Sequence, residues 1–280
     1  MPTAGLSAER TGNGEPLVLI HGTGSNRHVW RLALAALERH HEVLALDLPG
    51  HGDSAPLAED PTPGALGAAV ARELDRAGWE APHIVGHSLG GWIALELAAA
   101  GRARSVVGLA PSGGWTTPWE RWYAEMHLRS SRAAAQVISP HLELLERLRL
   151  LRPLQLGLLN RPWEIPAEDL LPAIRSLGSA ESALPAILHQ VASEGRDLDR
   201  IECPVLLLWG THDRLLLKRQ ARHLERSIRG AELRWLEGVG HAPQLECPEL
   251  TTEAIIEFTG SASTDTARAG AGVDGVQAQG

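Results

Sequence analysis

Six short apolar runs along the chain predict buried β-strands. They occupy residues 17–22, 42–47, 83–88, 105–110, 205–210 and 233–238. Their lengths and β-branched content are typical of strands, although the run at 205–209 does not by itself exclude a helix. A weaker run at residues 6–10 predicts one more strand, paired antiparallel at an edge of the sheet. The pattern therefore predicts a sheet whose strands are spread over most of the chain.

The stretches between these runs have the apolar spacing of helices. Helices are expected at residues 30–39, 65–77 and 91–100. Strands that alternate with helices form βαβ units, which give a parallel sheet with helices on both faces. The fold class predicted from the pattern is therefore α/β.

This alternation stops at residues 111–197, where no convincing strand occurs. Instead, apolar side chains recur at helical spacing, and prolines at positions 153, 162, 166, 172 and 185 interrupt the later part of the segment. One stripe consists of Trp119, Trp122, Tyr123 and Met126. A second consists of Leu144, Leu145, Leu148 and Leu151, with Glu143 and Arg147 expected to pair beside it. The segment is predicted to form an all-helical cap over the sheet.

These patterns divide the chain into three parts. Residues 1–110 and 198–260 are predicted to form the α/β core, and residues 111–197 the helical cap. Residues 261–280 are rich in Gly, Ala, Ser and Thr and poor in large apolar side chains. Such a segment buries too little surface to offset its ordering entropy, so a disordered tail is expected.

Composition excludes several classes of protein. The net charge of −8 argues against a nucleic-acid partner, because neutralising phosphates requires clustered Lys and Arg. Cys203 and Cys247 are the two cysteines, and they are interpreted as small apolar residues in a reducing compartment. The chain shows no signal-peptide pattern and no run of 18 apolar residues, so a cytoplasmic protein without a membrane partner is expected.

The clearest chemical motif is Gly86-His87-Ser88-Leu89-Gly90, which follows a predicted strand and precedes a predicted helix. This strand–turn–helix context is the one required for a nucleophile elbow. The sharp turn places Ser88 in strained backbone torsions and directs its hydroxyl outward. Only very small residues fit two positions on either side, where the strand and the helix nearly touch. Ser88 is therefore the candidate nucleophile.

A serine needs a base, and the base needs a carboxylate to orient it. Asp213 follows the strand predicted at 205–210, and His241 follows the one at 233–238. Both side chains would then lie at the same carboxyl edge of the sheet as Ser88. We predict a catalytic triad of Ser88, Asp213 and His241.

An acyl-transfer site also needs N–H donors that stabilise a developing oxyanion. The segment His21-Gly22-Thr23-Gly24 follows the first strong strand, and its small residues leave a backbone N–H free to face the site. The backbone N–H groups of Thr23 and Leu89 are the predicted oxyanion hole. The side chain of His21 is expected to be structural.

At this point the sequence resembles the α/β-hydrolase superfamily in its capped form, from Gly12 to about Phe258. The resemblance rests on five motifs in family order: the segments 21–24, 47–54, 86–91, 204–213 and 240–243. It implies a mostly parallel, eight-stranded sheet with a cap inserted after strand six, and the same triad. The family's first strand is short or absent here. His51 and Asp53, in the segment 47–54, are expected to have structural rather than catalytic roles.

These residues predict a serine hydrolase that cleaves an ester, thioester or lactone of a small apolar molecule, without metal or organic cofactor. A serine nucleophile argues against epoxide hydrolases and haloalkane dehalogenases, which resemble this chain but use an aspartate. Hydrolysis of C–C bonds, acyl transfer, cofactor-free haloperoxidase chemistry and natural-product cyclisation remain open, because one fold supports many reactions. A small-ligand receptor with little turnover is a further alternative. The oligomeric state stays open.

The substrate pocket is the least determined part of the site. The cluster Trp115, Trp119, Trp122 and Tyr123 begins directly after the strand that leads into the cap. These residues would form an aromatic pocket if their face is directed at the triad. The alternative is that the same stripe only docks the cap on the core.

Overall fold

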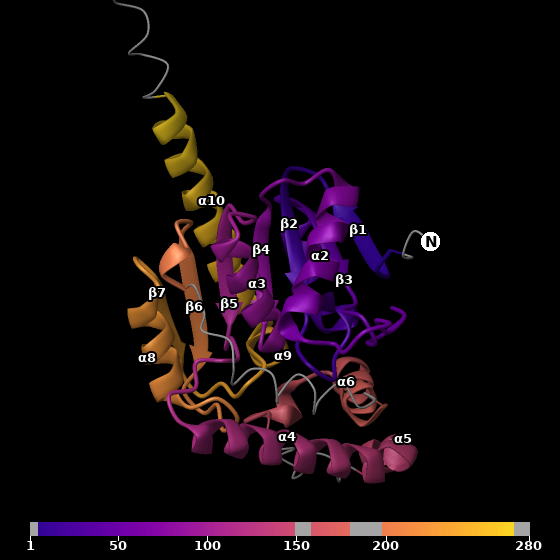
Figure 1. Cartoon of the computed structure of the whole chain (residues 1–280). Coiled ribbons are helices and arrows are strands. Elements are labelled where there is room, and N and C mark those ends of the chain that lie inside the picture. Colours follow the sequence, from indigo (N-terminus) through magenta and orange to yellow (C-terminus); the bar gives the residue numbers. More distant parts are fainter. Residues whose placement is uncertain (1–4, 149–157, 180–197, 272–280) are drawn as a thin grey trace, which may run out of the picture.

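A seven-stranded sheet forms the centre of the molecule (Figure 1). The computed structural model describes residues 5–148, 158–179 and 198–271, and for 264–271 the backbone only. The strands lie in the order β1-β3-β2-β4-β5-β6-β7. Their bounds are β1 (Ala8–Gly12), β2 (Glu15–Ile20), β3 (His41–Leu46), β4 (His83–His87), β5 (Ser105–Leu109), β6 (Val205–Gly210) and β7 (Glu232–Leu236).

Each strand corresponds to one of the seven apolar runs in the sequence. β1 pairs antiparallel with β3 at one edge, and every other neighbouring pair is parallel. All residues of β4, β5 and β6 are buried, which is why these runs are apolar without alternation. The described sheet has one strand fewer than the eight of the family, as expected for a chain whose first family strand is short or absent.

Helices cover both faces of the sheet, and the three predicted helical segments are confirmed as α1 (Arg31–Leu37), α2 (Pro63–Ala77) and α3 (Leu89–Ala99). In Figure 1, α2 and α3 lie in front of the sheet and α10 (Pro248–Ala271) crosses behind it, where it packs against α1. α8 (Lys218–Ser227) packs on β6 and β7. The doubly covered parallel sheet confirms the predicted fold class.

The inserted segment between β5 and β6 is helical where the structure describes it. Its elements are α4 (Pro118–Ile138), η2 (Ser139–His141), α5 (Leu142–Arg147), η3 (Pro162–Glu164) and α6 (Ala167–Ser179). Figure 1 shows α4 and α6 lying across the end of the sheet to which the strand arrows point. Arg31 on α1 holds α6 with two hydrogen bonds of 2.6 Å from its guanidinium to the Asp169 carboxylate.

The second apolar stripe of the insertion does not form the face that its spacing suggests. Leu144 and Leu148 are more than half exposed, and Leu151 lies outside the described residues. Glu143 pairs with Arg175 on α6 instead of with Arg147. The expectation was wrong here because α5 has only six residues, so its side chains are positioned by η2 and α6 and not by helical periodicity.

The expected disordered tail is also corrected in part. α10 continues past Gly260 to Ala271, and Ala262 is buried. The hydroxyl of Ser263 donates to the Thr259 carbonyl (3.0 Å) and to the Glu15 carboxylate, so contacts with the start of β2 extend the helix. Residues 272–280 lie outside the described part of the chain. In the described ranges, no helix is both long and apolar enough to cross a membrane.

Both cysteines are free thiols, as the sequence predicted. Burial raises the pKa of Cys247, whose sulfur lies 3.5 Å from the Thr251 hydroxyl, and raises that of Cys203 to about 11. Neither thiol is therefore disposed to ionise near neutral pH.

Several histidines are buried and kept neutral by the fold. His21 is fully buried, and burial lowers its pKa to about 3. Its Nδ1 donates to the carbonyl of Gly22 (2.8 Å), and its Nε2 accepts from the N–H of Leu48 (3.0 Å). This neutral ring therefore links the segments that follow β2 and β3, the structural role expected for it.

Acidification is expected to destabilise the protein, because the unfolded chain binds protons that the native state excludes. His21 has a pKa of about 3 in the folded protein and about 6.5 in the unfolded chain. Its contribution to the free energy of unfolding is therefore fully present above pH 6.5. It is lost as the pH falls from 6.5 towards 3, by about 2 kcal/mol at pH 5. Urea unfolding at pH 7.5 and pH 5 measures this loss.

A His21→Gln variant should be less stable than the unsubstituted protein at pH 7.5 and should show a smaller decrease between the two pH values. The same decrease in both proteins would contradict this account of His21.

Candidate active site

Ser88 occupies a sharp turn between β4 and α3. Its backbone torsions are φ 52° and ψ −112°, a combination that residues other than glycine rarely adopt. The N–H of Ser88 donates to Leu109 on β5 (2.9 Å), and its carbonyl accepts from the N–H of Ser112 (3.0 Å). The surrounding backbone thus holds the strained conformation that the motif predicted.

Two glycines permit this turn. A Cβ atom at Gly86 would overlap the carbonyl oxygen of Gly90, and one at Gly90 would overlap the carbonyl oxygen of Ile20. The backbones of β4, α3 and β2 therefore touch around the serine, which explains the glycine two positions away on each side.

Asp213 and His241 come together at the same edge of the sheet. The Nδ1 of His241 donates to Asp213 Oδ2 at 2.8 Å, and both side chains are buried. The other oxygen of Asp213 accepts from the N–H groups of Leu215 and Leu216, each at 2.9 Å. With the proton on Nδ1, the Nε2 of His241 retains its lone pair and is free to act as a base.

The loop that carries His241 is anchored to the cap. The N–H of His241 donates to the Leu158 carbonyl (2.8 Å). The carboxylate of Glu246 accepts from Gly240 (2.9 Å) on this loop and from Asn160 (2.8 Å) in the cap. Burial raises the pKa of Glu246, while the backbone N–H groups that it accepts from lower it. Segments far apart in sequence thus fix the position of the imidazole.

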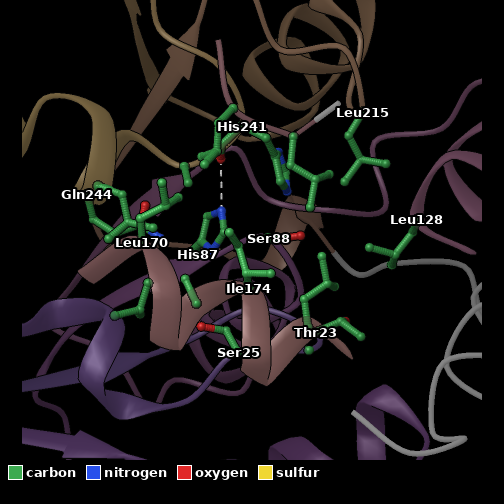
Figure 2. A pocket seen from close by; sticks show the side chains of 18 residues that line it. Thr23, Ser25, His87, Ser88, Leu128, Leu170, Ile174, Leu215, His241 and Gln244 are labelled. Atoms are coloured by element: carbon green, nitrogen blue, oxygen red, sulfur yellow. Dashed lines mark hydrogen bonds between the residues drawn. The ribbon is translucent and has the colours of Figure 1, made fainter. Parts of the chain in front are cut away.

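His87 supports the same loop from below (Figure 2). Its Nε2 donates to the carbonyl of His241 at 2.9 Å, and the two rings lie 4.9 Å apart. Burial lowers the pKa of His87 to about 3, so it stays neutral beside the second imidazole. The residue between Gly86 and Ser88 therefore helps to position His241.

Ser88 and His241 line one cavity (Figure 2), which together with its opening to solvent comprises about 730 Å³ of space not filled by protein atoms. Its remaining wall is mostly aliphatic and comes from the cap, from the loops after β2 and β6, and from α9 (Pro243–Glu246) and the residue before it. The aliphatic side chains are Val29, Leu128, Leu158, Leu159, Leu170, Ala173, Ile174, Leu177, Leu215, Ala242 and Leu245. An apolar molecule can therefore reach the serine.

A second cavity, of about 390 Å³ including its opening to solvent, also borders Ser88 and is partly aromatic. Trp92 and Trp115 contribute to it, and it shares Thr23, Ser88, Leu128 and Leu215 with the larger cavity. Of the four aromatic residues predicted for the substrate pocket, only Trp115 lines either cavity.

Trp119, Trp122 and Tyr123 line neither of these two cavities. Trp119 and Trp122 are 53% and 55% exposed, and the hydroxyl of Tyr123 donates to the carbonyl of Arg214 (2.8 Å). α4 instead turns Ala124 and Leu128 inward. The mixed sequence of α4 carries two apolar stripes, and periodicity alone does not decide which of them is buried.

The two predicted oxyanion donors flank Ser88. Thr23 and Leu89 line the smaller cavity together with the serine. Leu89 is the first residue of α3, so its N–H has no acceptor within the helix. Among the described residues, the N–H of Thr23 likewise makes no backbone hydrogen bond.

The loop at residues 47–54 has a structural arrangement. Buried Asp47 accepts from the N–H groups of Arg27 (2.6 Å) and Asp53 (3.0 Å) and pairs with the Arg27 guanidinium. His51 Nδ1 donates to the Pro49 carbonyl (3.1 Å), and Asp53 pairs with Arg27 (2.8 Å). Neither His51 nor Asp53 lines the cavities beside Ser88.

Sequence reasoning missed several residues of the site. Leu170, Ile174 and Leu177 form the α6 wall of the larger cavity, and their spacing of i, i+4 and i+7 is a helical signal present in the sequence. Gln244 also lines this cavity, three residues after His241. Among the described residues, no cluster of three or more His, Cys, Asp or Glu side chains is placed to hold a metal ion.

Comparison with known proteins agrees with this architecture. Residues 17–254 match the Alpha/beta hydrolase family, so the chain belongs to that family and is a hydrolase. It is 34% identical over 197 residues to epoxide hydrolase EphH of Mycobacterium tuberculosis, covering 68% of this chain and 91% of that protein. It is 31% identical over 254 residues to a pimeloyl-[acyl-carrier protein] methyl ester esterase of Neisseria meningitidis, covering 86% of this chain and 75% of that one.

Among solved structures, an esterase from Rhodococcus sp. ECU1013 superposes with a TM-score of 0.72 at 25% identity. The match covers 91% of this chain and 94% of the esterase.

A methyl group at Gly90 is expected to disrupt the elbow. In Gly90→Ala the new Cβ meets the Ile20 backbone, which cannot move aside as a flexible side chain would. We expect a loss of about 3 kcal/mol or more in the free energy of unfolding, or no soluble protein. Chemical denaturation followed by circular dichroism measures the loss.

Gly64→Ala is the matched control, because a Cβ there meets only the Thr62 hydroxyl at 3.8 Å. It should unfold within about 1 kcal/mol of the unsubstituted protein. Equal stabilities for the two variants would contradict the proposed backbone contact.

Proposed function

We propose that the protein is a serine hydrolase that cleaves an ester, thioester or lactone of a small, largely apolar molecule. The observation that carries this proposal is the arrangement at the sheet edge. Ser88 on a strained turn shares a cavity with His241, whose Nδ1 is bonded to Asp213 at 2.8 Å. Similarity to an esterase and to an ester-cleaving relative supports the same reaction type.

In the proposed mechanism, the Nε2 of His241 removes the proton of the Ser88 hydroxyl as its oxygen attacks the substrate carbonyl. The protonated imidazole then gives this proton to the departing alcohol or thiol, which leaves an acyl group on Ser88. His241 next activates a water that releases the acid and restores the serine. Asp213 orients the imidazole and stabilises its charged form.

The backbone N–H groups of Thr23 and Leu89 are proposed to hold the negative oxygen of the tetrahedral intermediates. Leu89 stands at the N-terminus of α3, where the helix dipole favours negative charge. The proposed reaction requires no metal ion and no organic cofactor. A cytoplasmic location remains part of the proposal, and the two free thiols fit a reducing compartment.

Epoxide hydrolysis is the second candidate, because one relative is named an epoxide hydrolase. Attack of Ser88 on an epoxide would form an alkyl ether, which water does not cleave under mild conditions. Attack on an ester forms an acyl group that water removes. The serine at position 88 therefore favours the ester.

Loss of the nucleophile tests the proposed function. Ser88→Ala should keep its fold and lose turnover of p-nitrophenyl esters by roughly 10³–10⁶-fold, because no covalent intermediate can form. Stopped assays of p-nitrophenyl hexanoate hydrolysis measure the loss, and circular dichroism verifies the fold.

Ser130→Ala, which changes an exposed serine of α4, is the control and should match the unsubstituted enzyme. Undiminished ester turnover in Ser88→Ala would refute the assignment. Steady hydrolysis of styrene oxide that depends on Ser88, without ester turnover, would favour the second candidate.

The aliphatic cavity predicts a preference for substrates with an apolar chain. Ile174 is buried in its wall, so Ile174→Trp should fill the space that such a chain occupies. We expect kcat/KM for p-nitrophenyl octanoate to fall about 10-fold or more relative to p-nitrophenyl acetate.

Val137→Trp adds the same side chain to an exposed position of the cap and should leave the ratio unchanged. If Ile174→Trp also keeps the octanoate-to-acetate ratio of kcat/KM, the acyl chain of the substrate does not occupy this cavity.

A further inference from the structure

Gln244 is a polar side chain in the mostly aliphatic wall of the larger cavity. Gln244 is completely buried and lines this cavity together with Ser88 and His241 (Figure 2). Within the described residues, neither its amide nitrogen nor its amide oxygen has a hydrogen-bond partner. The residue therefore brings to the cavity wall a buried donor and a buried acceptor that no described residue uses.

An amide buried without partners is unfavourable for folding. It shifts the folding equilibrium by roughly 10- to 100-fold against the native state, relative to an apolar side chain of similar size. The neighbouring wall residues Leu170, Ile174 and Leu245 fill comparable positions without this penalty. A bound molecule with its own polar group would satisfy the amide and remove the penalty.

We propose that Gln244 is a specificity-determining residue that hydrogen-bonds a neutral polar group, such as a ketone, hydroxyl or amide, in the acyl chain of the substrate. The inference deepens the proposed function and rests on it. The substrate is then not a simple fatty ester: its acyl chain is apolar near the reacting carbonyl and carries one hydrogen-bonding group further along.

The lack of charged side chains in the described part of the wall is the reason for proposing a neutral group in the substrate. Among the residues that the structure describes, no Lys, Arg, Asp or Glu lines the larger cavity, and His87, which does line it, has a pKa lowered to about 3. A carboxylate or ammonium group would lose its hydration there without gaining an opposite charge. An amide side chain, which offers one donor face and one acceptor, suits a neutral partner instead.

The linings of the two cavities are the reason why the proposal places the polar group in the acyl chain. The smaller cavity is lined in part by Trp92 and Trp115, whose rings are the kind of surface on which an aromatic leaving group such as p-nitrophenol packs. The acyl chain of such an ester then extends into the larger, aliphatic cavity that contains Gln244.

The experiment scans a ketone along the acyl chain. The probes are the p-nitrophenyl esters of 4-oxopentanoic, 5-oxohexanoic and 6-oxoheptanoic acids, each compared with its parent ester without the ketone. For at least one pair, kcat/KM of the unsubstituted enzyme should favour the oxo ester by about 10-fold. In Gln244→Leu, this preference should fall about 10-fold while the parent ester is still hydrolysed.

Gln244→Asn gives a readout that a purely structural role would not produce. Its amide is one methylene shorter, so the preferred ketone should move one carbon further along the chain. This variant also decides the question if Gln244→Leu does not fold. Gln220→Leu is the matched control, since Gln220 is a buried glutamine without side-chain partners among the described residues and lines neither cavity. It should leave the ratios unchanged.

The outcomes distinguish a failure of the role proposed for Gln244 from a failure of the proposed function. If Gln244→Leu and Gln244→Asn keep the ratios of the unsubstituted enzyme, or if no oxo ester is preferred, the role of Gln244 is wrong. In that case an inactive Ser88→Ala still supports the serine hydrolase. An equal change of the ratios in Gln220→Leu would also overturn the inference. Undiminished turnover by Ser88→Ala would instead refute the proposed function itself.

Discussion

The direct contact between the backbones of β2, β4 and α3 is the constraint on which the candidate site depends. Gly86 and Gly90 allow these three elements to touch, and Ser88 at the turn between them then has no relaxed conformation available. The cost of the strained torsions is offset by the buried, doubly covered sheet on which the turn is built. A looser packing would let the turn relax and would withdraw the hydroxyl from the edge where the imidazole lies.

The same edge brings together residues that are distant in sequence because parallel strands end there. Ser88 directly follows β4, Asp213 lies in the loop after β6, and His241 lies in the loop after β7. This convergence could be predicted from the sequence, since each residue directly follows an apolar run and the runs alternate with helices. The fully buried strands β4, β5 and β6 stand out most clearly in the sequence, whereas the largely exposed β1 corresponds to a weaker apolar run.

The cap was less predictable, for a physical reason. α4 carries the residues Trp119 and Trp122 on one face and Ala124 and Leu128 on another, and both faces contain apolar side chains. The face that turns inward is fixed by long-range contacts, such as the pairing of buried Glu120 with Arg219 and the bond from Tyr123 to Arg214. Glu120, a charged residue, is buried while two tryptophans are exposed, and helical periodicity alone does not predict this distribution of buried and exposed side chains.

The electrostatics of the site follow from its burial. Two imidazoles lie 4.9 Å apart at the base, and a positive charge on His87 would disfavour the protonated form of His241 that the proposed mechanism requires. Burial removes this conflict, because it holds the pKa of His87 near 3. The bond from His87 Nε2 to the carbonyl of His241 also fixes the tautomer of His87, so that a neutral donor supports the loop. Burial thus has two effects at this site: the wall around Ser88 is largely apolar, and His87 stays uncharged, which leaves His241 as the histidine of the pair that accepts the Ser88 proton in the proposed mechanism.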